Sequence, residues 1–435
     1  MATLIEPPST ATSRPVASEL LKPLLDKLFD ERLGVMFEFW DGSTCGRDAV
    51  GRLHFKSPDA LRAILWSPDE LGVARAFVSG SIDVSGNVAQ VLRGLQQSLR
   101  GDIGLLLQAS PQLLRAVRAT GGIGARPPLP DEEILPRGVR HSLRRDREAI
   151  SHHYDVGNSF YELVLGSSMT YSCARFVTPD IALHDAQAAK HELICRKLGL
   201  NEPGAERMRL LDIGCGWGSM AIHAASDYGA DVVGVTISDE QAAYARRRVT
   251  RLGLDDRVEI RVQDYREVAD GPFDAISSIG MAEHVGKRRM ALYFERLYGL
   301  LRPGGRVLNH AISSVGGSRL PRRSFAHRYV FPDGELLDVA DTVRFMEQAG
   351  FEIRDVQNLR EHYAQTLRFW VENLERNWDV AVGLVGEARA RVWLLYMSGS
   401  INGFDDAGLH LHQTLGVRLH DDGRSDMPPT RLGWS

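Results

Sequence analysis

The sequence has no apolar stretch of the roughly 18 residues that a membrane-spanning helix needs. It has little excess of either charge, since 52 Lys and Arg stand against 56 Asp and Glu. That balance argues against a dedicated nucleic-acid-binding protein, although it leaves room for a local basic patch. The N-terminal residues lack a basic start followed by an apolar run, which argues against a secretory signal. We expect residues 1–17 to form a short disordered lead.

Cysteine is also scarce. The chain has only four cysteines and no CxxC pair, which disfavours a zinc ribbon or a disulfide framework and fits a reducing cytosol best. No carboxylate-rich or Cys/His cluster suggests a metal site. His410, His412 and His420 are loosely spaced in an apparent C-terminal tail, and we interpret them as surface residues.

The composition that remains is that of an ordinary globular protein. Its 435 residues are 43% hydrophobic and 25% charged, which predicts roughly two or three domains. Leucines between residues 20 and 28 fall on one helical face, and residues 58–65 and 87–99 also look helical. Residues 35–43 and 49–57 resemble a β-hairpin, with Asp41-Gly42 near its turn. We therefore predict a small α+β domain over residues 18–125.

Residues 126–148 are the best linker candidate, because four prolines lie close together at their start. A run of arginines follows between 137 and 147, with Asp146 as its single acid. One interpretation is a solvated helix start. The other is a contact for anionic lipid headgroups, since each basic residue near an anionic surface contributes about 1 kcal/mol.

From about residue 190 onward, short apolar strands alternate with helical segments. Strands are expected at 209–213, 231–236, 257–262, 273–280 and 304–313, with helices between most of them. Such alternation predicts βαβ units and a mostly parallel sheet. The expected fold class is therefore α/β, with a Rossmann-like domain over residues 149–435 and the smaller α+β domain before it.

The first strand of that sheet ends in Asp212 and a loop with the spacing GxGxG, whose glycines are Gly214, Gly216 and Gly218. Glycines let the backbone turn sharply and approach a ligand, and ligands of open α/β sheets bind at the carboxyl ends of strands. The spacing is not GxGxxG and no GK[ST] follows, which excludes a P-loop and weakens a dinucleotide site. The second strand ends at Thr236, and Asp264 and Tyr265 follow the third.

These three strand ends are suited to the amino-acid part, ribose and adenine of S-adenosylmethionine. The second strand ends without an acid, so the ribose contacts must come from Thr236, Gln241 or Asp212. The pattern predicts a methyltransferase.

Several ordered motifs carry a more specific resemblance. ISHHYDVGNSFYELVLGSSMTYSCARF (150–176), LLDIGCGWG, VTISDEQ, QDYRE, SIGMAEHVG, LNHAIS and HYAQTLRFW resemble, in this order, the cyclopropane-fatty-acyl-phospholipid synthases. The matching motifs run from about 150 to 370, and the first domain is less specifically similar to that family's lipid-handling domain.

The resemblance implies transfer of a methyl group from S-adenosylmethionine to the double bond of an unsaturated acyl chain in a membrane phospholipid. It also implies a bound bicarbonate as the base. The residues that correspond to the bicarbonate ligands are Cys173, Glu283, His310, Ile312 and Tyr363. Those that correspond to cofactor ligands are Tyr171, Ser172, Gly214, Gly216, Gly218, Thr236, Gln241, Tyr265 and Arg266. The resemblance further suggests a homodimer in the cytoplasm, peripherally associated with the inner membrane surface.

The chemistry fits these residue types. Attack by an alkene leaves a carbocation on the chain, so the site must be apolar and dry. Aromatic faces stabilise a cation by about 0.5–2 kcal/mol each, and the candidates are Tyr154, Phe160, Tyr161, Tyr171 and Phe176. Tyr363 and His310 can donate hydrogen bonds to a buried bicarbonate, and Glu283 can accept its hydroxyl proton.

Each candidate also has a structural interpretation. Cys173 can be a small buried hydrophobe, with its backbone rather than its thiol as the ligand. His310 can be a core histidine, and Glu283 can cap the helix that follows it.

One departure from the family leaves the product open. A Phe usually precedes the EH pair, whereas this chain has Met281-Ala282. Ring closure of the carbocation gives a cyclopropane. A hydride shift followed by proton loss gives a methylene-branched chain, which a reductase partner then converts to a methyl branch. Two other hypotheses are a methyltransferase for a soluble small molecule and a catalytically dead lipid-binding protein.

Overall fold

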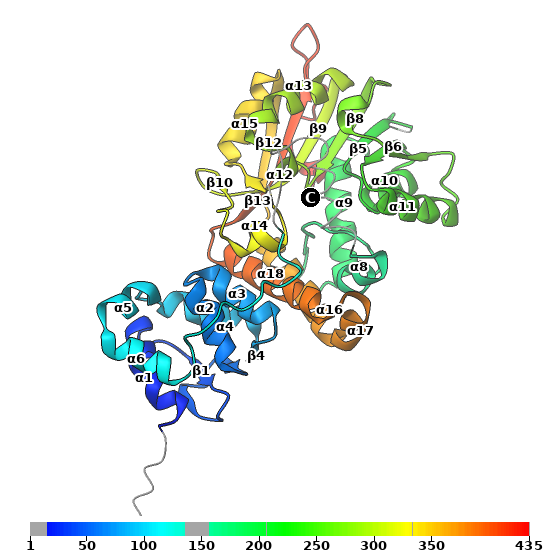
Figure 1. The fold of residues 1–435 in the computed structure, drawn as a ribbon. Coiled ribbons are helices and arrows are strands. Elements are labelled where there is room, and N and C mark those ends of the chain that lie inside the picture. Colours follow the sequence, from blue (N-terminus) through cyan, green and yellow to red (C-terminus); the bar gives the residue numbers. More distant parts are fainter. Residues whose placement is uncertain (1–14, 135–155, 206, 333, 435) are drawn as a thin grey trace, which may run out of the picture. The chain divides into compact units, whose positions relative to one another are not determined.

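The computed structural model describes residues 15–134, 156–205, 207–332 and 334–434. The chain divides into two compact units, residues 1–130 and 131–435, and we describe each by itself (Figure 1). The boundary falls inside the proline-rich stretch 126–148. The arginine run 137–147, Tyr154 and the start of the 150–176 motif lie outside the described residues. A lipid-contact role for the first unit therefore stays a prediction.

The first unit is a small α+β domain, as predicted. Its elements are α1 (Ala17–Leu28), β1 (Val35–Glu38), β2 (Thr44–Gly46), β3 (Gly51–Phe55), α2 (Pro58–Trp66), α3 (Glu70–Val78), β4 (Ile82–Gly86), α4 (Val88–Ser98), α5 (Ile103–Ala109) and α6 (Pro111–Ala119). The apolar face of α1 is buried through Leu21, Leu24 and Leu28. These leucines share one core with Phe37 of β1 and Phe55 of β3.

The predicted hairpin is wrong in its pairing. The strands form a four-stranded sheet in the order β2-β1-β3-β4. β1 turns back through Asp41-Gly42 onto the short strand β2, whereas β3 lies parallel to β1. Local turn signals located the reversal correctly but could not identify its partner, because β3 makes its antiparallel pair with the later strand β4.

The second unit is an α/β domain. Its elements before the sheet's last parallel strand are α8 (Asn158–Leu165), α9 (Leu183–Leu198), β5 (Arg209–Ile213), α10 (Ser219–Tyr228), β6 (Asp231–Thr236), α11 (Asp239–Arg251), β7 (Val258–Val262), η1 (Tyr265–Glu267), β8 (Phe273–Ile279), α12 (Ala282–Val285), η2 (Lys287–Arg289), α13 (Met290–Leu300) and β9 (Leu301–Ser313). The remaining elements are β10 (Ser318–Arg319), α14 (Phe325–Tyr329), β11 (Glu335–Leu336), α15 (Val339–Gln348), β12 (Phe351–Asn358), α16 (Arg360–Arg376), α17 (Trp378–Val385), α18 (Glu387–Asp405), β13 (His410–Arg418) and η3 (Leu432–Trp434).

The seven-stranded sheet of this unit has the order β12-β13-β9-β8-β5-β6-β7. Strands β9, β8, β5, β6 and β7 are mutually parallel, and β13 is antiparallel to both of its neighbours. The predicted Rossmann-like sheet is therefore confirmed.

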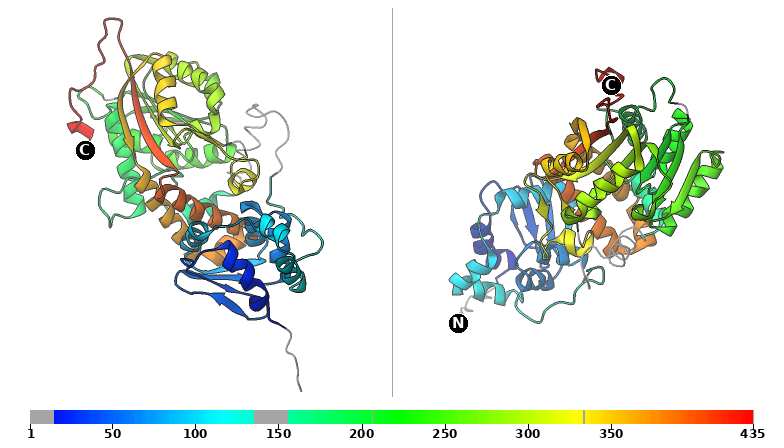
Figure 2. Two further views of the ribbon diagram at one scale, coloured as in Figure 1. Left: turned by 90° about the vertical axis from the view of Figure 1, so that its left-hand side faces the viewer. Right: turned by 90° about the horizontal axis from the view of Figure 1, so that it is seen from above.

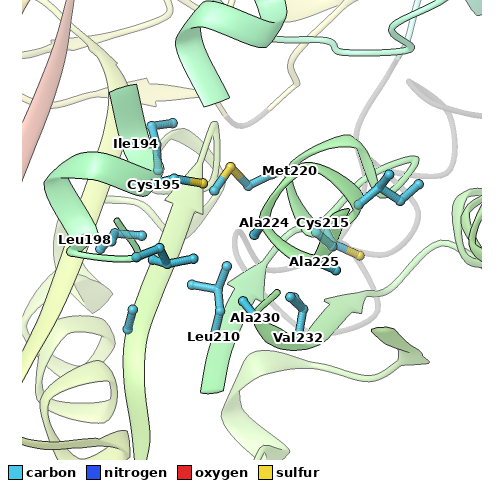
Figure 3. Close-up of a cluster of buried hydrophobic side chains, with 14 of the residues drawn as sticks. Ile194, Cys195, Leu198, Leu210, Cys215, Met220, Ala224, Ala225, Ala230 and Val232 are labelled. Carbon is cyan, nitrogen blue, oxygen red and sulfur yellow. The ribbon is translucent and has the colours of Figure 1, made fainter. Parts of the chain in front are cut away.

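Helices cover both faces of this sheet (Figure 2). Side chains alternate between the faces along each strand, so Leu210 packs on the side of α9 and α10 and Leu211 on the side of α13. Figure 3 shows part of the first of these layers, in which Ile194 of α9, Met220 of α10 and Leu210 of β5 belong to one buried cluster. Both faces are apolar, which is why these strands read as nearly continuous hydrophobic runs.

The prediction that His410 and His412 lie in a C-terminal tail is wrong. They are on β13, which is inserted between β9 and β12. Both are half-buried, and His412 Nδ1 lies 2.7 Å from the Ser313 hydroxyl of the neighbouring strand. No local sequence pattern indicates that the chain returns into the sheet here. Among the described helices, none combines the length and apolar character that crossing a bilayer requires.

Candidate active site

A cavity lies at the carboxyl ends of β5, β6 and β8, at the edge of the sheet where the sequence predicted the cofactor. Ten of the predicted cofactor residues line it: Tyr171, Ser172, Asp212, Gly214, Gly216, Thr236, Gln241, Asp264, Tyr265 and Arg266. Gly218 is not among the lining residues. A Cβ there would lie 3.0 Å from the Ala245 side chain, so this glycine permits close packing of α10 on α11.

The loop after β5 is anchored to the neighbouring strand. The amides of Gly214 and Cys215 both donate to the Val235 carbonyl, at 2.9 and 3.0 Å. Gly214 and Gly216 have positive φ angles of 73° and 53°. A Cβ on Gly214 would lie 2.7 Å from Met281 Cγ, whereas a Cβ on Gly216 would meet nothing within 4 Å. The two glycines thus hold the backbone against the cavity without a side chain in the way.

The end of β6 arranges a polar pair. The Thr236 hydroxyl donates to Gln241 Oε1 at 2.9 Å, and both residues are buried. This bond turns the Gln241 amide group so that its N–H donors point away from Thr236, which suits hydroxyl acceptors of a ligand. Of the three ribose candidates, Thr236 thus orients Gln241, and Asp212 is bound instead by the Ser277 hydroxyl at 2.7 Å.

The third strand end carries an ion pair. Asp264 accepts hydrogen bonds from the Arg266 backbone amide at 2.9 Å and from its guanidinium at 2.8 and 2.6 Å. Arg266 is therefore held beside the cavity by a local carboxylate. The Tyr265 ring packs edge-on against Tyr293, with centroids 5.0 Å apart.

Sequence analysis missed Lys190, a fully buried cation of α9 that lines the cavity. Its ammonium donates to the Ser172 hydroxyl and to His191 Nε2, both at 3.0 Å. Burial lowers the pKa of Lys190 and raises that of Asp212. Asp212 Oδ2 has no hydrogen-bond partner within the part of the chain that the structure describes. Its position among the buried residues of 183–198, a helix whose inner face also carries Gln187, His191 and Lys197, was the signal that could have revealed it.

Glu283 and His310 lie on neighbouring elements beyond this cavity. Glu283, on α12, accepts a hydrogen bond from the Ile312 amide at 2.7 Å, and Ile312 lies two residues after His310 on β9. Glu283 thus reaches across to β9. The Ile312 amide, which was predicted as a ligand of the anion, instead donates to the Glu283 carboxylate and orients it.

Burial raises the pKa of Glu283 to about 7. Burial and the charges of Lys190 and Lys197 hold the pKa of His310 well below its usual range, so this ring is neutral. Among the described residues, Glu283 Oε2 and His310 Nε2 have no hydrogen-bond partner. Glu283 therefore offers a buried open acceptor, and His310 offers a buried open ring nitrogen.

Cys173 and Tyr363 both contact the backbone carbonyl of Leu359, which links them to the strands around Ile312. The Cys173 thiol lies 3.6 Å from the Leu359 carbonyl, which also accepts from the Tyr363 amide at 3.2 Å. The Leu359 amide in turn donates to the carbonyl of Leu411, the cross-strand neighbour of Ile312. Burial raises the pKa of the Cys173 thiol far above neutrality, so this thiol is not a nucleophile.

Aromatic rings of α8 and the C-terminal helices pack against Tyr171 and Trp217, two rings that line the cavity. Of the five candidates, Phe160, Tyr161 and Tyr171 belong to this group, Phe176 instead stacks on His362 and Phe369, and Tyr154 lies outside the described residues. Tyr171 lies 5.3 Å from Trp370 and 5.8 Å from Trp393 between ring centroids. The sequence analysis assigned no role to Trp393 of α18, and Trp370 entered it only as the last residue of the HYAQTLRFW motif.

Comparison with known proteins agrees with this geometry. The family model described as mycolic acid cyclopropane synthetase matches residues 141–414. A "Probable fatty acid methyltransferase" of Mycobacterium tuberculosis is 42% identical over 92% of this chain and 94% of its own. Another "Probable fatty acid methyltransferase", of Pseudomonas putida, is 39% identical over 94% of this chain and 98% of its own.

A solved mycolic acid cyclopropane synthase in complex with SAH and CTAB superposes with a TM-score of 0.57 at 32% identity. It covers 62% of this chain and 98% of its own, so the likeness concerns the second unit. The cavity, the glycine loop and the matched residues together establish that the chain belongs to the mycolic acid cyclopropane synthetase family of S-adenosylmethionine-dependent lipid methyltransferases.

Proposed function

We propose that this methyltransferase alkylates the double bond of an unsaturated acyl chain in a membrane phospholipid and yields a cyclopropane fatty acid. In this reaction the methyl C–S bond breaks and a C–C bond forms, which leaves a carbocation on the acyl chain. Loss of a proton from the transferred methyl group closes the ring. The products are the cyclopropane chain, S-adenosylhomocysteine and a proton, and the chain gains one CH2.

The single observation that carries this proposal is a pair of buried polar atoms without partners in the described structure, on α12 and on β9, two elements that the bond from the Ile312 amide to Glu283 joins. Glu283 Oε2 and His310 Nε2 lack hydrogen-bond partners among the described residues. A small anion that carries both a proton and acceptor oxygens matches such a pair, and bicarbonate, with a basic oxygen for the proton that is lost, fits it. Glu283, His310 and Tyr363 would hold this anion, while the Ile312 amide orients Glu283.

The cofactor cavity also fits its ligand. Bound S-adenosylmethionine supplies the electrophilic sulfonium methyl group. Lys190 and Asp212 place a buried cation and a buried carboxylate in one cavity, which matches the zwitterionic amino-acid end of this cofactor. Gln241, oriented by Thr236, is suited to the ribose hydroxyls.

The aromatic cover supports carbocation chemistry. Phe160, Tyr161 and Trp370 are almost completely buried, so they exclude water that would quench the cation. Each ring face beside the cation stabilises it by about 0.5–2 kcal/mol.

The proposal is tested by the product. Purified protein is incubated with S-adenosylmethionine and vesicles of oleoyl phospholipid, and the acyl chains are examined by proton NMR. Mass does not decide, because ring and methylene products both gain one CH2. Upfield ring protons are the expected result. No lipid product, with cofactor bound, would contradict the proposal and favour a soluble substrate or a catalytically dead fold.

A methylene-branched product is the second candidate. Met281 lies against Gly214 and lines the cavity where the family usually has a Phe before the EH pair. Both full-length relatives are named as fatty acid methyltransferases, without mention of a ring. Vinylidene protons in the same NMR experiment would select this product and imply a reductase partner.

We also propose that the enzyme acts as a homodimer at the inner membrane surface, as a peripheral protein of the cytoplasm. An acyl chain of a phospholipid is reached only at a bilayer, and the arginine run 137–147 suits anionic headgroups.

Because of Glu283, we expect the stability of the apo protein to fall with rising pH over the range in which the turnover of the enzyme rises. Its pKa is raised to about 7, so the native state keeps a proton that the unfolded chain loses near pH 4.5. Between these values stability falls by up to about 1.4 kcal/mol per pH unit. Turnover rises over the same range, because the carboxylate is the form that accepts a proton. Denaturant unfolding at several pH values should show a flatter profile for Glu283→Gln, and an unchanged profile would contradict the assignment.

A further inference from the structure

A row of polar side chains crosses three neighbouring strands behind His310. Gln413 of β13 lies directly opposite His310 of β9, and Gln357 of β12 lies directly opposite Gln413. Paired residues of adjacent strands point to the same face of a sheet, and here that face is covered by α9. His310 and Gln413 are fully buried. Buried polar groups are nearly always hydrogen-bonded, so the partners of this row determine how each group is oriented.

Lys197 of α9 fixes the direction of this row. Its ammonium donates to Gln413 Oε1 at 2.9 Å and to Gln357 Oε1 at 2.7 Å, and it pairs with Asp355 at 2.8 Å. A lysine has only donors, so the oxygen of the Gln413 amide must face Lys197. The nitrogen of that amide then faces His310 Nδ1, 3.3 Å away.

This arrangement determines which ring nitrogen of His310 carries the proton. An amide N–H group can only donate, so Nδ1 must accept and the proton of the neutral ring must lie on Nε2. We propose that Gln413, held by Lys197, is a positioning residue that fixes His310 as the Nε2-protonated neutral tautomer. Nε2 is the nitrogen that is left without a partner among the described residues, and Glu283 accepts from the amide two residues farther along the same strand.

The surrounding charges keep the ring in this form. Lys190 and Lys197, which lie seven residues apart on α9, both disfavour an imidazolium at His310. A neutral ring fixed in this tautomer offers one N–H donor to a bound anion, while the Glu283 carboxylate offers an acceptor. The inference rests on the proposed function, because it assigns that donor to the anion that holds the base.

The decisive variant is Gln413→Glu, which has nearly the same shape. The introduced carboxylate still accepts from Lys197, but it can no longer donate to Nδ1. The His310 ring must therefore place its proton on Nδ1, facing that carboxylate, and leave Nε2 as an acceptor. A purely structural role for Gln413 predicts no loss, because the contact with Lys197 is kept.

Gln357→Glu is the matched control. It introduces the same charge beside the same lysine, one strand farther from the ring, and no contact between Gln357 and His310 is seen in the described structure.

The tautomer is read directly from the 15N chemical shifts of the histidine rings in 15N-histidine-labelled protein. The signals of His310 are assigned as those that disappear in the His310→Gln variant. Measurements are made at about pH 8, above the usual histidine pKa of about 6.5. We expect a protonated Nε2 in the wild type and in Gln357→Glu, and a protonated Nδ1 in Gln413→Glu. We expect kcat to fall about 100-fold or more in Gln413→Glu alone, with cofactor affinity unchanged.

The wild-type spectrum needs no variant, so the test does not depend on folding of a mutant. A protonated Nδ1 in the wild type would overturn the proposal. So would full turnover in Gln413→Glu with a reversed tautomer. Failure of the proposed function looks different: the tautomer would follow the prediction while the wild-type enzyme gives no lipid product.

Discussion

Replacing Glu283 with glutamine is expected to lower turnover about 1,000-fold while cofactor binding is kept. Glutamine preserves the shape and can still accept from the Ile312 amide, which now bonds Glu283 at 2.7 Å. It cannot take a proton from a bound anion, so the orientation and basicity of that anion are lost. The measurement is kcat with vesicle substrate, together with the Kd of S-adenosylmethionine by calorimetry.

Glu335→Gln is the matched control. Glu335 is also buried and also accepts from a backbone amide, that of Lys287 at 3.0 Å. Its other oxygen accepts from Arg319 at 2.6 Å, whereas Glu283 Oε2 has no partner among the described residues. Its replacement is expected to leave turnover within a few-fold of wild type. If Glu283→Gln kept full activity, Glu283 would have no part in the chemistry.

Lys190→Met is expected to weaken binding of S-adenosylmethionine about 100-fold, or about 2.7 kcal/mol. Methionine fills a similar volume but removes the buried cation, so the carboxylate of the cofactor would lose its charge partner. Asp212 would also remain without a nearby cation in a buried site, which favours its protonated form. Calorimetric titration with cofactor measures the effect.

Lys197→Met serves as the comparison, since Lys197 is equally buried on the same helix but does not line the cofactor cavity. We expect Lys197→Met to lower turnover, because Lys197 holds Gln413, and to leave cofactor affinity unchanged. Equal losses of affinity in both variants would show that α9 had shifted, and unchanged affinity in Lys190→Met would remove Lys190 from the cofactor site.

The cofactor residues are the most predictable part of the site. Asp212 and Thr236 lie at the carboxyl ends of β5 and β6, and Asp264 follows β7. The carboxyl ends of parallel strands meet at one edge of a sheet. Strand pattern and glycine spacing are therefore sufficient to place these residues together. Gly218 is the exception, since a glycine that allows close helix packing looks the same in sequence as one that faces a ligand.

Residues that act through distant pairing are not predictable in this way. Gln413 reaches His310 only because β13 returns from the C-terminal part of the chain and inserts beside β9. Lys190 and Trp393 occupy buried positions of α9 and α18. The helical periodicity of the sequence indicates that these positions are buried, but it does not indicate what the side chains contact. The pairing of β1 with β3 is hidden for the same reason, because local turns do not specify nonlocal partners.

The sequence alone determined the class of the fold, the cofactor edge of the sheet and the family, since these depend on local periodicity and on ordered motifs. Only the tertiary structure decided which buried polar groups are left without partners in the described part of the chain and in which protonation state they are held. Burial raises the pKa of Glu283 to about 7, and the row from Lys197 through Gln413 to His310 assigns the ring proton. Both depend on desolvation and on contacts between strands and helices far apart in the chain.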